Sequence, residues 1–425
     1  MTTTKSATRA RDASRRKNGT LSCRVLIVGG GLAGLTLAAR LGKAGLPVIV
    51  ADRESKKARA ALPFDGRTTA ISFGSQQVLN SAGLWQPLLP DAEPILDIRI
   101  ADDRQPLFLH FDHREMASES DGAPFGHIVE NRLIRLAQFA ALNDLKSVTH
   151  LAPATVTAID RADEAVTATL ADGTQIKAEI VIGADGRGSM VRQDASIGFR
   201  RWRYDQHAIV CTIAHAKPHA GLALEHFMPE GPFAVLPMTD APKAKGNGVD
   251  HRSSIVWTER PARADYFLGL SVPDFNKALN ERMGDYLGRV RLLGDRFRYP
   301  LGVLHARRYT DTRLALIGEA AHAIHPIAGQ GLNLGLRDVA LLSELLIDRA
   351  RLGLDLGDRG LLATYERRRR PDNATMLATT DLLNRLFSNR VLPIRAARGL
   401  GLEMVGRLPP LKRFFMRQAM GLGLR

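Results

Sequence analysis

The hydrophobic positions in the first part of the chain follow the order strand, turn, helix, strand. Residues 23–28 (CRVLIV) form a mostly apolar run, and residues 29–34 (GGGLAG) interrupt it with glycines. Apolar residues in 35–45 recur at helical spacing, and 47–52 (PVIVAD) has the composition of a second buried strand. This pattern predicts a compact βαβ unit.

The middle of the chain has the pattern of antiparallel sheet. Residues 165–186 alternate β-branched and polar positions around an Asp-Gly pair, which predicts a hairpin leading into a buried strand at 180–183. The mixed stretch 207–300 is our candidate for a second, sheet-based lobe. Short strands are expected there at 207–215, 232–238 and 252–259.

Toward the C-terminus the first pattern returns. A buried strand (RLALIG, 313–318) precedes a glycine-rich loop, and helical spacing follows at about 332–348 and 361–387. We therefore predict an α/β protein in which a Rossmann-type domain is built from separate pieces of the chain, with an interleaved β-sheet lobe and C-terminal helices. The expected boundaries are 21–95, 125–190 and 300–380 for the Rossmann-type domain, 96–124 and 191–299 for the lobe, 1–20 for a disordered basic tail, and 381–425 for a helical basic tail.

The composition fits a globular protein of more than one lobe. The chain has 425 residues, of which 45% are hydrophobic, so it can bury a large core. Its longest mainly apolar stretch, Val25 to Ala39, has 15 residues with four glycines, short of the roughly 20 that span a bilayer. Cys23 and Cys211 lie in no metal-ligand spacing, and we expect buried thiols in a reducing cytosol.

The positive charge is concentrated at the two ends of the chain. Residues 1–20 carry six basic residues against one acidic, and residues 381–425 carry nine against two, so only +3 of the net +15 lies between them. A nucleic-acid binder would spread basic and aromatic residues over one surface, so no nucleic-acid partner is expected. The basic ends favour contact with an anionic membrane surface, or simply solubility.

The glycine turn after the first strand has the spacing of a dinucleotide site. Gly29, Gly31 and Gly34 satisfy G-x-G-x-x-G between a strand and a helix, where backbone can approach a pyrophosphate. Asp52 ends the next strand, 23 positions after Gly29, close to the spacing of about 20 for an acid that binds ribose hydroxyls. A purely structural turn is the alternative, but the complete context favours an NAD-like ligand or FAD.

Two further glycine motifs follow buried strands. The first is GADGRGS at 183–189, and the second is GEAAH at 318–322 continued by HPIAGQGLNLG at 325–335. Glycines just before a helix let a planar ring lie against backbone, and the free N–H groups there can stabilise an anionic flavin. His322 and His325 could suggest metal ligands, but no carboxylate accompanies them at a suitable spacing, so loop structure or flavin contact is favoured over a metal.

Together, GGGLAG, GADG and GEAAH…HPIAGQGLNLGLRD resemble the motifs of the FAD-dependent aromatic hydroxylases of the para-hydroxybenzoate hydroxylase type. Within that group, HPIAGQGLNLGLRD is similar to the ubiquinone-biosynthesis hydroxylase family. Stretches such as DGRTTAISFGSQQVLNSAGLW and GPFAVLPM extend the resemblance over residues 23–423.

This resemblance implies an FAD-dependent monooxygenase that uses NAD(P)H as co-substrate and O₂. Its implied substrate is a polyprenylphenol intermediate of ubiquinone biosynthesis, whose aromatic ring would be hydroxylated. Because the cofactor carries the chemistry, no catalytic side chain is expected. A monooxygenase of a soluble phenol, and a flavin-poor accessory protein of a ubiquinone-synthesis complex, are the alternatives.

The resemblance also assigns positions to the cofactor. Gly29, Gly31, Gly34 and Asp52 would bind the ADP half, and Asp185 would help to hold the phosphates. Arg67 would contact the cofactor from the DGR segment, and Asn131 and Arg132 would reach the pyrophosphate or flavin from the side. For Arg67 and Arg132, a solvated surface arginine is the alternative. The flavin ring would be lined by the late loop, through Pro326, Gly329, Gln330, Gly331, Leu332 and Asn333.

One position departs from the family pattern. Gly318-Glu319 stands where the family has Gly-Asp, whose carboxylate accepts a hydrogen bond from the ribityl chain. Glu319 keeps the charge but adds a methylene, so the same bond needs a shifted backbone or another rotamer. The accessory-protein hypothesis rests on this substitution and on the basic ends.

The last residues predict an amphipathic helix. At helical spacing, Leu411, Phe414, Phe415, Ala419 and Leu422 share one face, and Arg413 and Arg417 lie opposite. Such a helix suits a membrane interface or partner proteins, and equally an ordinary helix packed on the enzyme body. We expect a cytoplasmic protein, with peripheral attachment to the inner face of the membrane as the further hypothesis.

Overall fold

The computed structural model describes all residues except 1–19, 61–65, 103–107, 243–248, 388–403 and 423–425. Its first sheet is the predicted Rossmann-type sheet, with five parallel strands and one antiparallel edge strand. In spatial order the strands are β19 (Thr310–Asp311), β20 (Leu314–Leu316), β13 (Ile180–Gly183), β2 (Val25–Val28), β3 (Val48–Ala51) and β9 (Val148–Leu151). Strands from far apart in the chain therefore meet in one sheet, as the returning pattern predicted.

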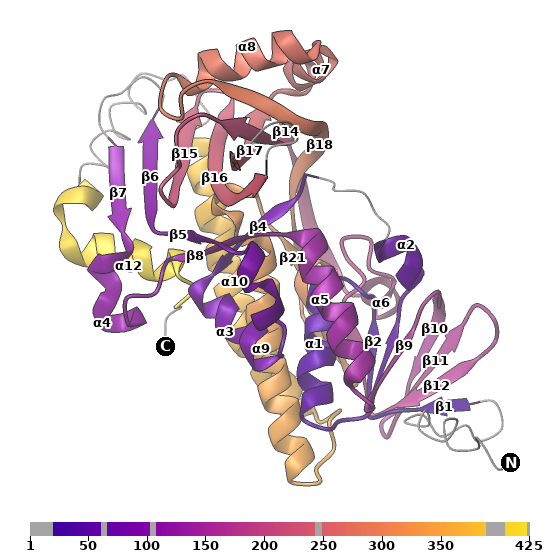
Figure 1. The fold of residues 1–425 in the computed structure, drawn as a ribbon. Helices are drawn as coiled ribbons and strands as arrows, with labels where there is room; N and C mark the ends of the chain where they lie inside the picture. Colours follow the sequence, from indigo (N-terminus) through magenta and orange to yellow (C-terminus); the bar gives the residue numbers. More distant parts are fainter. Residues whose placement is uncertain (1–19, 61–65, 103–107, 243–248, 388–403, 423–425) are drawn as a thin grey trace, which may run out of the picture.

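Helices and a small sheet cover the two faces of this sheet. Figure 1 shows α1 (Leu32–Lys43), α5 (Asn131–Asp144) and α9 (Gln330–Arg351) on one side, and the small sheet on the other. The small sheet has the order β1 (Thr20–Ser22), β12 (Gln175–Ala178), β11 (Val166–Leu170) and β10 (Val156–Arg161). The β11–β12 hairpin confirms the Asp-Gly turn prediction. Helix α1 begins three residues earlier than predicted, directly after the glycines.

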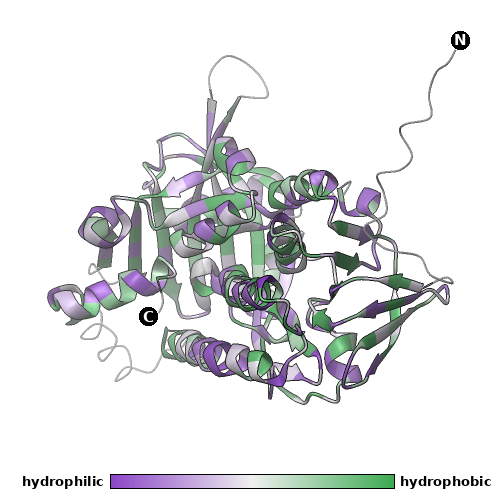
Figure 2. Cartoon of the chain, turned by 90° about the horizontal axis from the view of Figure 1, so that it is seen from below, coloured by the Kyte–Doolittle hydropathy of each residue, from purple (hydrophilic) through white to green (hydrophobic). Residues whose placement is uncertain are grey.

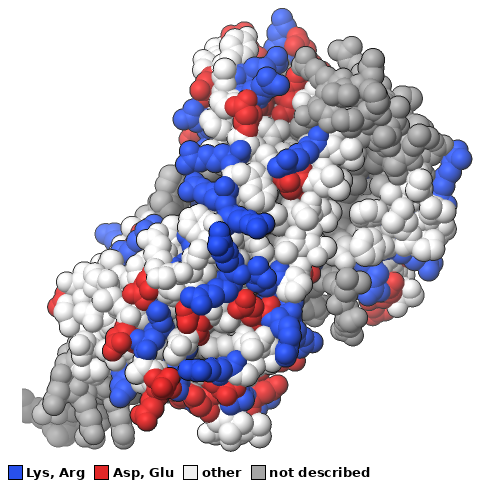
Figure 3. Space-filling view, turned by 180° about the vertical axis from the view of Figure 1, so that it is seen from behind, with Lys and Arg blue, Asp and Glu red and all other residues white. Residues whose placement is uncertain are grey.

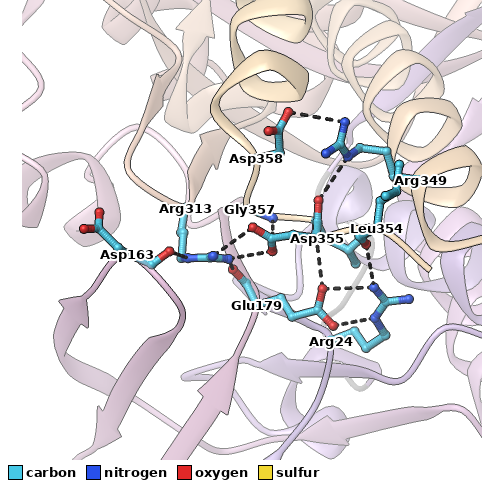
Figure 4. A network of polar contacts seen from close by, with 10 residues as sticks. Arg24, Asp163, Glu179, Arg313, Arg349, Leu354, Asp355, Gly357 and Asp358 are labelled. Atoms are coloured by element: carbon cyan, nitrogen blue, oxygen red, sulfur yellow. Dashed lines mark hydrogen bonds and ion pairs between the residues drawn. The ribbon is translucent and has the colours of Figure 1, made fainter. Parts of the chain in front are cut away.

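A network of ion pairs and hydrogen bonds ties the amino ends of these strands together (Figure 4). Arg313, in the β19–β20 turn, is 6% exposed and binds both oxygens of Asp355 at 2.8 Å. It also donates to the backbone oxygens of Glu179 and Asp163. The Glu179 side chain in turn accepts from Arg24, which precedes β2. The network therefore links the first, middle and late pieces of the domain.

The second lobe is an eight-stranded sheet. Its order is β21 (His322–Ala323), β18 (Val290–Ala306), β14 (Phe199–His215), β17 (Val249–Glu259), β16 (Gly231–Pro242), β15 (Leu222–Met228), β6 (Asp97–Asp102) and β7 (Phe108–Asp112). The three strands expected in 207–259 are present as parts of β14, β16 and β17, and each of these is longer than predicted. Strands β14 and β18 cross the whole lobe with 17 residues each. Helices α7 (Pro261–Gly269) and α8 (Val272–Met283) cover an apolar cluster around Trp257 and Phe275.

A three-stranded sheet and a long helix connect the two lobes. The sheet has the order β4 (Thr68–Ser72), β8 (Gly126–Glu130), β5 (Glu93–Ile95). Helix α10 (Arg359–Phe387) runs from the Rossmann-type domain to β16 of the second lobe and contains Pro371. Both late helices exist as predicted; α9 extends beyond both expected ends, and α10 begins two residues early.

The C-terminal helix packs on the protein body. Helix α12 (Pro409–Ala419) places Met416 in an apolar cluster with β7 and β8, and Met420, just after the helix, joins it. Lys412 and Arg417 form ion pairs with Glu115 and Glu119. Of the two readings of this helix, packing on the enzyme body is the one the structure shows, because much of the apolar face is used there. The residues 381–387, assigned to the tail, instead continue α10.

The remaining short elements complete the chain. They are α2 (Lys56–Ala60), α3 (Phe73–Ser81), α4 (Ala117–Ser120), α6 (Met190–Asp194), η1 (Gln86–Asp91), η2 (His113–Met116), η3 (Gly318–Ala320) and η4 (Ile327–Gly329). Figure 2 shows that the strands are largely hydrophobic and that the outer helices carry hydrophilic positions.

Cys211 is fully buried, whereas Cys23, expected to be buried, keeps part of its surface exposed. None of the helices in the described part combines the length and apolar character needed to cross a bilayer. The expected disordered tail, 1–20, lies outside the described residues except for Thr20, which begins β1.

Candidate functional site

The three glycine motifs meet at the start of α1. A Cβ at Gly29 would overlap the carbonyl oxygen of Ala184 in the second motif and would lie 2.8 Å from the Cα of Asp185. In the third motif, Gly318 and Gly335 lie against Ala33 of α1, since a Cβ at either glycine would be 3.4 or 3.6 Å from the Ala33 Cβ. Residues separated by up to 306 positions thus form one surface. The glycines are required because backbone packs on backbone there.

The N-terminus of α1 has the shape of an anion site. Gly31 is its N-cap, no side chain caps the helix, and the first turn contains no acidic residue. Around Gly31 there is space, because a Cβ there would meet no protein atom closer than 3.9 Å. Free N–H groups and the positive end of the helix dipole therefore face an open region, as a pyrophosphate requires.

Asp52 lies where the ribose-binding acid was predicted, but it has a partner. Its side chain is 1% exposed at the end of β3, and Arg59 of α2 binds it, with Nη2 2.9 Å from Oδ1 and Nε 2.6 Å from Oδ2. The sequence reasoning did not single out Arg59. A ribose that bonds to Asp52 would have to share this carboxylate with Arg59 or displace it.

Asp185 has an unused acceptor at the junction of the motifs. Its Oδ2 accepts the backbone N–H of Val191 at 3.1 Å, which fixes the side chain at the start of α6. Its Oδ1 is buried and has no hydrogen-bond partner in the described structure. A buried carboxylate oxygen without a donor costs free energy, so this atom is suited to a donor that a ligand brings.

Glu319 reaches across to the second motif. It lies on η3, is 54% exposed and forms an ion pair with Arg187, whose Nε is 2.9 Å from Oε1. The longer side chain of Glu319 thus points its carboxylate toward Arg187 of the second motif. Arg187 was not among the predicted contacts, although it lies between Gly186 and Gly188 of a motif that was recognised.

The late loop leads into another helix N-terminus without a side-chain cap. Gly329, with φ of 63°, is the N-cap of α9, and its first turn has no capping side chain and no acid. A Cβ at Gly331 would meet no atom within 4 Å, so the backbone beside it is open. Pro326 caps η4 just before this turn, and Gln330 and Leu332 belong to the turn itself.

The side chain of Asn333, a predicted cofactor contact, is hydrogen-bonded within the protein. It is fully buried, its Nδ2 donates to the Ala70 carbonyl at 2.8 Å, and its Oδ1 accepts from the Ser72 N–H at 3.1 Å. Its side chain therefore fixes α9 to β4. Any cofactor contact from Asn333 would come from its backbone.

Arg67, Asn131 and Arg132, expected at the side of the cofactor, lie close together in the structure. The backbone N–H of Asn131, the first residue of α5, donates to the Arg67 carbonyl at 3.1 Å. The Asn131 Oδ1 accepts a hydrogen bond from the Thr69 hydroxyl. Arg67 is exposed and its guanidinium lies 5.7 Å from the Tyr299 ring centroid. Arg132 is also exposed and is 3.4 Å from Glu130.

His322 is part of a buried ion cluster. Its Nε2 is 2.6 Å from Oδ2 of Asp338, and Oδ1 of Asp338 accepts from Arg369 Nε at 2.8 Å. Burial by itself raises the pKa of Asp338, but His322 and Arg369 outweigh it and hold the pKa well below the usual range. Oδ2 also accepts the Gly318 N–H at 3.0 Å. The cluster therefore fixes the loop that carries Glu319. Among the described residues, no group of side chains is arranged to hold a metal ion.

His325 is a buried imidazole beside the predicted flavin loop. Both ring nitrogens lack a hydrogen-bond partner within the described chain, and burial lowers its pKa to about 3. The ring stands edge-on to Tyr204 of β14, with 5.2 Å between centroids. Tyr204 donates to Asp381 of α10. This cluster is where the Rossmann-type domain, the large sheet and α10 meet.

Comparison with known proteins identifies relatives of the whole chain. The FAD binding domain family matches residues 22–380. The ubiquinone hydroxylase UbiL of Rhodospirillum rubrum is 51% identical over 93% of this chain and 89% of its own length. The 3-demethoxyubiquinol 3-hydroxylase of Escherichia coli is 33% identical over 94% of this chain and 98% of its own.

Solved structures confirm the fold. The p-nitrophenol 4-monooxygenase PnpA of Pseudomonas putida superposes with a TM-score of 0.75, covering 95% of this chain and 99% of that one at 22% identity. At this identity the likeness concerns the architecture: a Rossmann-type domain with an interleaved sheet lobe.

Proposed function

This chain belongs to the family of FAD-dependent ubiquinone-biosynthesis hydroxylases, and from that premise we propose that it hydroxylates the aromatic ring of a polyprenylphenol intermediate with NAD(P)H and O₂. The observation that supports this most directly is the convergence of three glycine motifs on the start of α1. Two relatives that match nearly the whole chain are ubiquinone or demethoxyubiquinol hydroxylases by name.

The residues at the junction fit FAD. Two uncapped helix N-termini, those of α1 and α9, leave free N–H groups beside the open backbone of Gly31 and Gly331. The buried, unpartnered Oδ1 of Asp185 lies on the motif that packs on Gly29. An electrically neutral ligand would leave both helix dipoles uncompensated, whereas the pyrophosphate of FAD and an electron-rich flavin suit them.

When bound, FAD supplies the redox chemistry that inserts one atom of O₂ into an electron-rich ring. The chain's own residues have other tasks. Gly29, Gly31 and Gly34 would admit the ADP half, with Asp52 toward the ribose and Asp185 toward the phosphates. The loop and first turn of α9, from Pro326 to Asn333, would border the flavin ring, with Asn333 contributing its backbone. Further contacts would come from Arg67, Asn131, Arg132 and Glu319.

Buried aromatic and imidazole groups would exclude water from the flavin. His325 stays neutral because burial holds its pKa at about 3, so it adds no charge to the site. Tyr204 and Trp202 both donate to Asp381, which keeps this side of the site hydrogen-bonded and rigid. Exclusion of water protects reactive intermediates from unproductive decay.

We propose that the boundaries given above separate an FAD-binding domain from a substrate lobe, with the lobe extended to Ala306, where β18 ends. A membrane or partner-protein contact would use the apolar side chains that α12 and its approach leave exposed, namely Met404, Leu408 and Phe414, at 54%, 47% and 43%. Exposed Arg413 beside them would favour an anionic surface.

The test is a mass-spectrometric profile of quinone lipids from cells lacking this gene. A precursor that lacks one hydroxyl should accumulate, and the normal sequence should remove it, whereas a Gly31→Ala, Asp52→Ala double variant should not. The mass and fragmentation of the precursor identify the ring position. Unchanged ubiquinone would favour a soluble phenol as substrate, and rescue by the double variant would favour an accessory role without FAD.

A further inference from the structure

A cavity between β14, β18 and α10 is lined almost entirely by cationic and imidazole side chains. Its volume is about 370 Å³, and its lining consists of Arg200, His305, Ala306, Arg307 and Arg370. Arg200 of β14 lies directly opposite His305 of β18 in the sheet register. Opposite residues of a strand pair point to the same face, so both side chains share this space. Arg370 enters it from α10.

This cavity is distinct from the FAD site. Phe199, the neighbour of Arg200 in β14, lies 4.5 Å from the guanidinium of Arg192, which donates to the Arg187 carbonyl in the second motif. Successive side chains of a strand point to opposite faces, so Arg200 faces away from that motif. None of the cavity residues is among the expected FAD contacts.

The arginines of the cavity are exposed and form no ion pair within the described structure. No ion pair joins Arg200, Arg307 or Arg370 to a carboxylate of the described residues. Arg369, one position before Arg370, shows the contrast, since it binds both Asp338 and Asp372. Like charges gathered around one space repel each other, and a bound anion removes that cost.

The imidazole in the cavity is also unsatisfied. His305 Nε2 is buried and has no hydrogen-bond partner among the described residues. Burial, then the nearby Arg370, His322 and Arg200, lower its pKa to about 4, so the ring is neutral and can donate one hydrogen bond. The charge around it is therefore positive, and the face seen from behind carries a band of Lys and Arg side chains (Figure 3).

We propose that this cavity binds the phosphate group of a small ligand. Guanidinium groups recognise phosphate oxygens in pairs of hydrogen bonds, and three of them surround one space here. At roughly 30 Å³ per water, the volume equals about a dozen waters, more than a single phosphate fills. The phosphate therefore belongs to a larger molecule, and a nucleotide and a phospholipid headgroup are the two sources that share this chemistry.

The cavity lies directly behind the flavin loop. In the β18–β21 pair, His305 is opposite His322, the residue that binds Asp338. Tyr309 stands edge-on to His305 and stacks on His322, with centroid distances of 5.7 and 6.0 Å. A ligand in the cavity would thus contact the strand pair that supports the third motif.

The test titrates inorganic pyrophosphate into the full-length protein saturated with FAD, so that the site at α1 is filled, and measures binding by calorimetry. We expect one binding event, weakened roughly tenfold or more in Arg200→Gln and in Arg370→Gln. Arg367→Ala is the matched control, because Arg367 is exposed on the same helix and donates to Thr364. No binding by the native protein, or equal binding by every variant, overturns the proposal.

Further arms of the experiment distinguish the sources. Displacement of pyrophosphate by NADH or NADPH, lost in the Arg variants, identifies a nucleotide. Sedimentation with phosphatidylglycerol vesicles, lost in the same variants, identifies a lipid headgroup. Pyrophosphate binding that neither ligand displaces indicates another phosphate compound as the occupant. Melting curves verify folding, and Arg307→Gln replaces any variant that fails to fold. Because no turnover is measured, failure of the hydroxylase proposal would leave this result unaffected.

Discussion

The carbonyl oxygen of Ala184 occupies the position that a side chain at Gly29 would need. The two residues belong to motifs 155 positions apart in the chain, and their contact joins β2 to β13 just where the parallel strands end. Gly29 also has a φ of 110°, which L side chains rarely adopt. This glycine is therefore needed for the fold itself, whereas Gly31 beside it has open space.

Gly29→Ala and Gly31→Ala should separate folding from cofactor binding. We expect Gly29→Ala to lower the free energy of unfolding by at least about 1–3 kcal/mol, because it adds backbone strain to a steric overlap. Gly31→Ala should leave that free energy within about 0.5 kcal/mol but weaken FAD binding roughly tenfold or more, because its methyl meets the pyrophosphate and not the protein. Urea titration and flavin fluorescence measure the two effects.

The control is Gly269→Ala, at the end of α7, where a Cβ would also meet no atom within 4 Å. It should leave FAD binding unchanged and, as the last residue of a helix, should raise the free energy of unfolding by at most about 1 kcal/mol. If Gly31→Ala bound FAD as tightly as this control, the pyrophosphate would not lie at the α1 N-terminus.

Gly331→Ala should stabilise the protein without FAD and destabilise the complex. Alanine is the better helix former, by up to about 1 kcal/mol, and the open space beside Gly331 accepts a methyl. The same methyl would stand where the flavin ring approaches the α9 backbone. The melting temperature of the FAD-free variant should rise or stay unchanged, while its FAD content after purification falls. Full retention of FAD would place the ring elsewhere.

Arg187→Ala should strengthen FAD binding slightly. Arg187 holds Glu319 in an ion pair that is half exposed, so releasing the carboxylate costs only about 0.2–1 kcal/mol. If Glu319 must turn to a ribityl hydroxyl, removing its competitor should lower the Kd about 1.5- to 5-fold. Equilibrium titration of FAD-free protein measures this. A weaker complex would show instead that Arg187 itself contacts the cofactor.

Asp338→Asn should lower stability strongly and change its dependence on pH. The substitution leaves His322 and Arg369 without their buried carboxylate, and breaking such a pair costs about 3–5 kcal/mol. Because the folded protein lowers the pKa of Asp338, its contribution is complete above the unfolded pKa of about 3.9 and declines as the pH falls below it. Urea unfolding at pH 7 and pH 3.5 should show a smaller acid loss in the variant than in the native protein.

Helix α12 should contribute to stability through its methionines more than through its charges. Met416→Ala removes a fully buried side chain and should cost about 2–5 kcal/mol. Arg417→Ala breaks a partly exposed ion pair with Glu119 and should cost less than about 1 kcal/mol. Thermal unfolding distinguishes them. Equal, small effects would mean that α12 leaves the body in solution and is available to a membrane.

Local pattern was sufficient to predict the nucleotide-binding core. The run before Gly29, the Asp-Gly hairpin and the late glycine loop each carry a short-range signal, and the structure confirms those elements with shifts of a few residues at their ends. The α/β class could also be predicted, because buried parallel strands appear in the sequence as continuous apolar runs.

Pairing between distant residues could not be predicted in this way. Arg59 on Asp52 and Arg187 on Glu319 are contacts made by tertiary packing, which leaves no periodicity in the sequence. Asn333 looked like a cofactor ligand by position, yet its amide is used on β4. The amphipathic pattern of α12 fits an interior partner as well as a membrane, and the packing of Met416 on the body could be seen only in the structure.

The strand order of the Rossmann-type sheet has a consequence for synthesis of the protein. Strand β2 emerges from the ribosome early. Its neighbour β13 begins only at residue 180, and β20, the neighbour of β13, begins only at residue 314. Since translation proceeds at about 5–20 residues per second, the first glycine turn waits tens of seconds for the strands that complete its surface. Strand β3 can cover one side of β2 early, but the other side stays an open strand edge until β13 is made. Because the third glycine motif follows β20, FAD can join only a nearly finished protein.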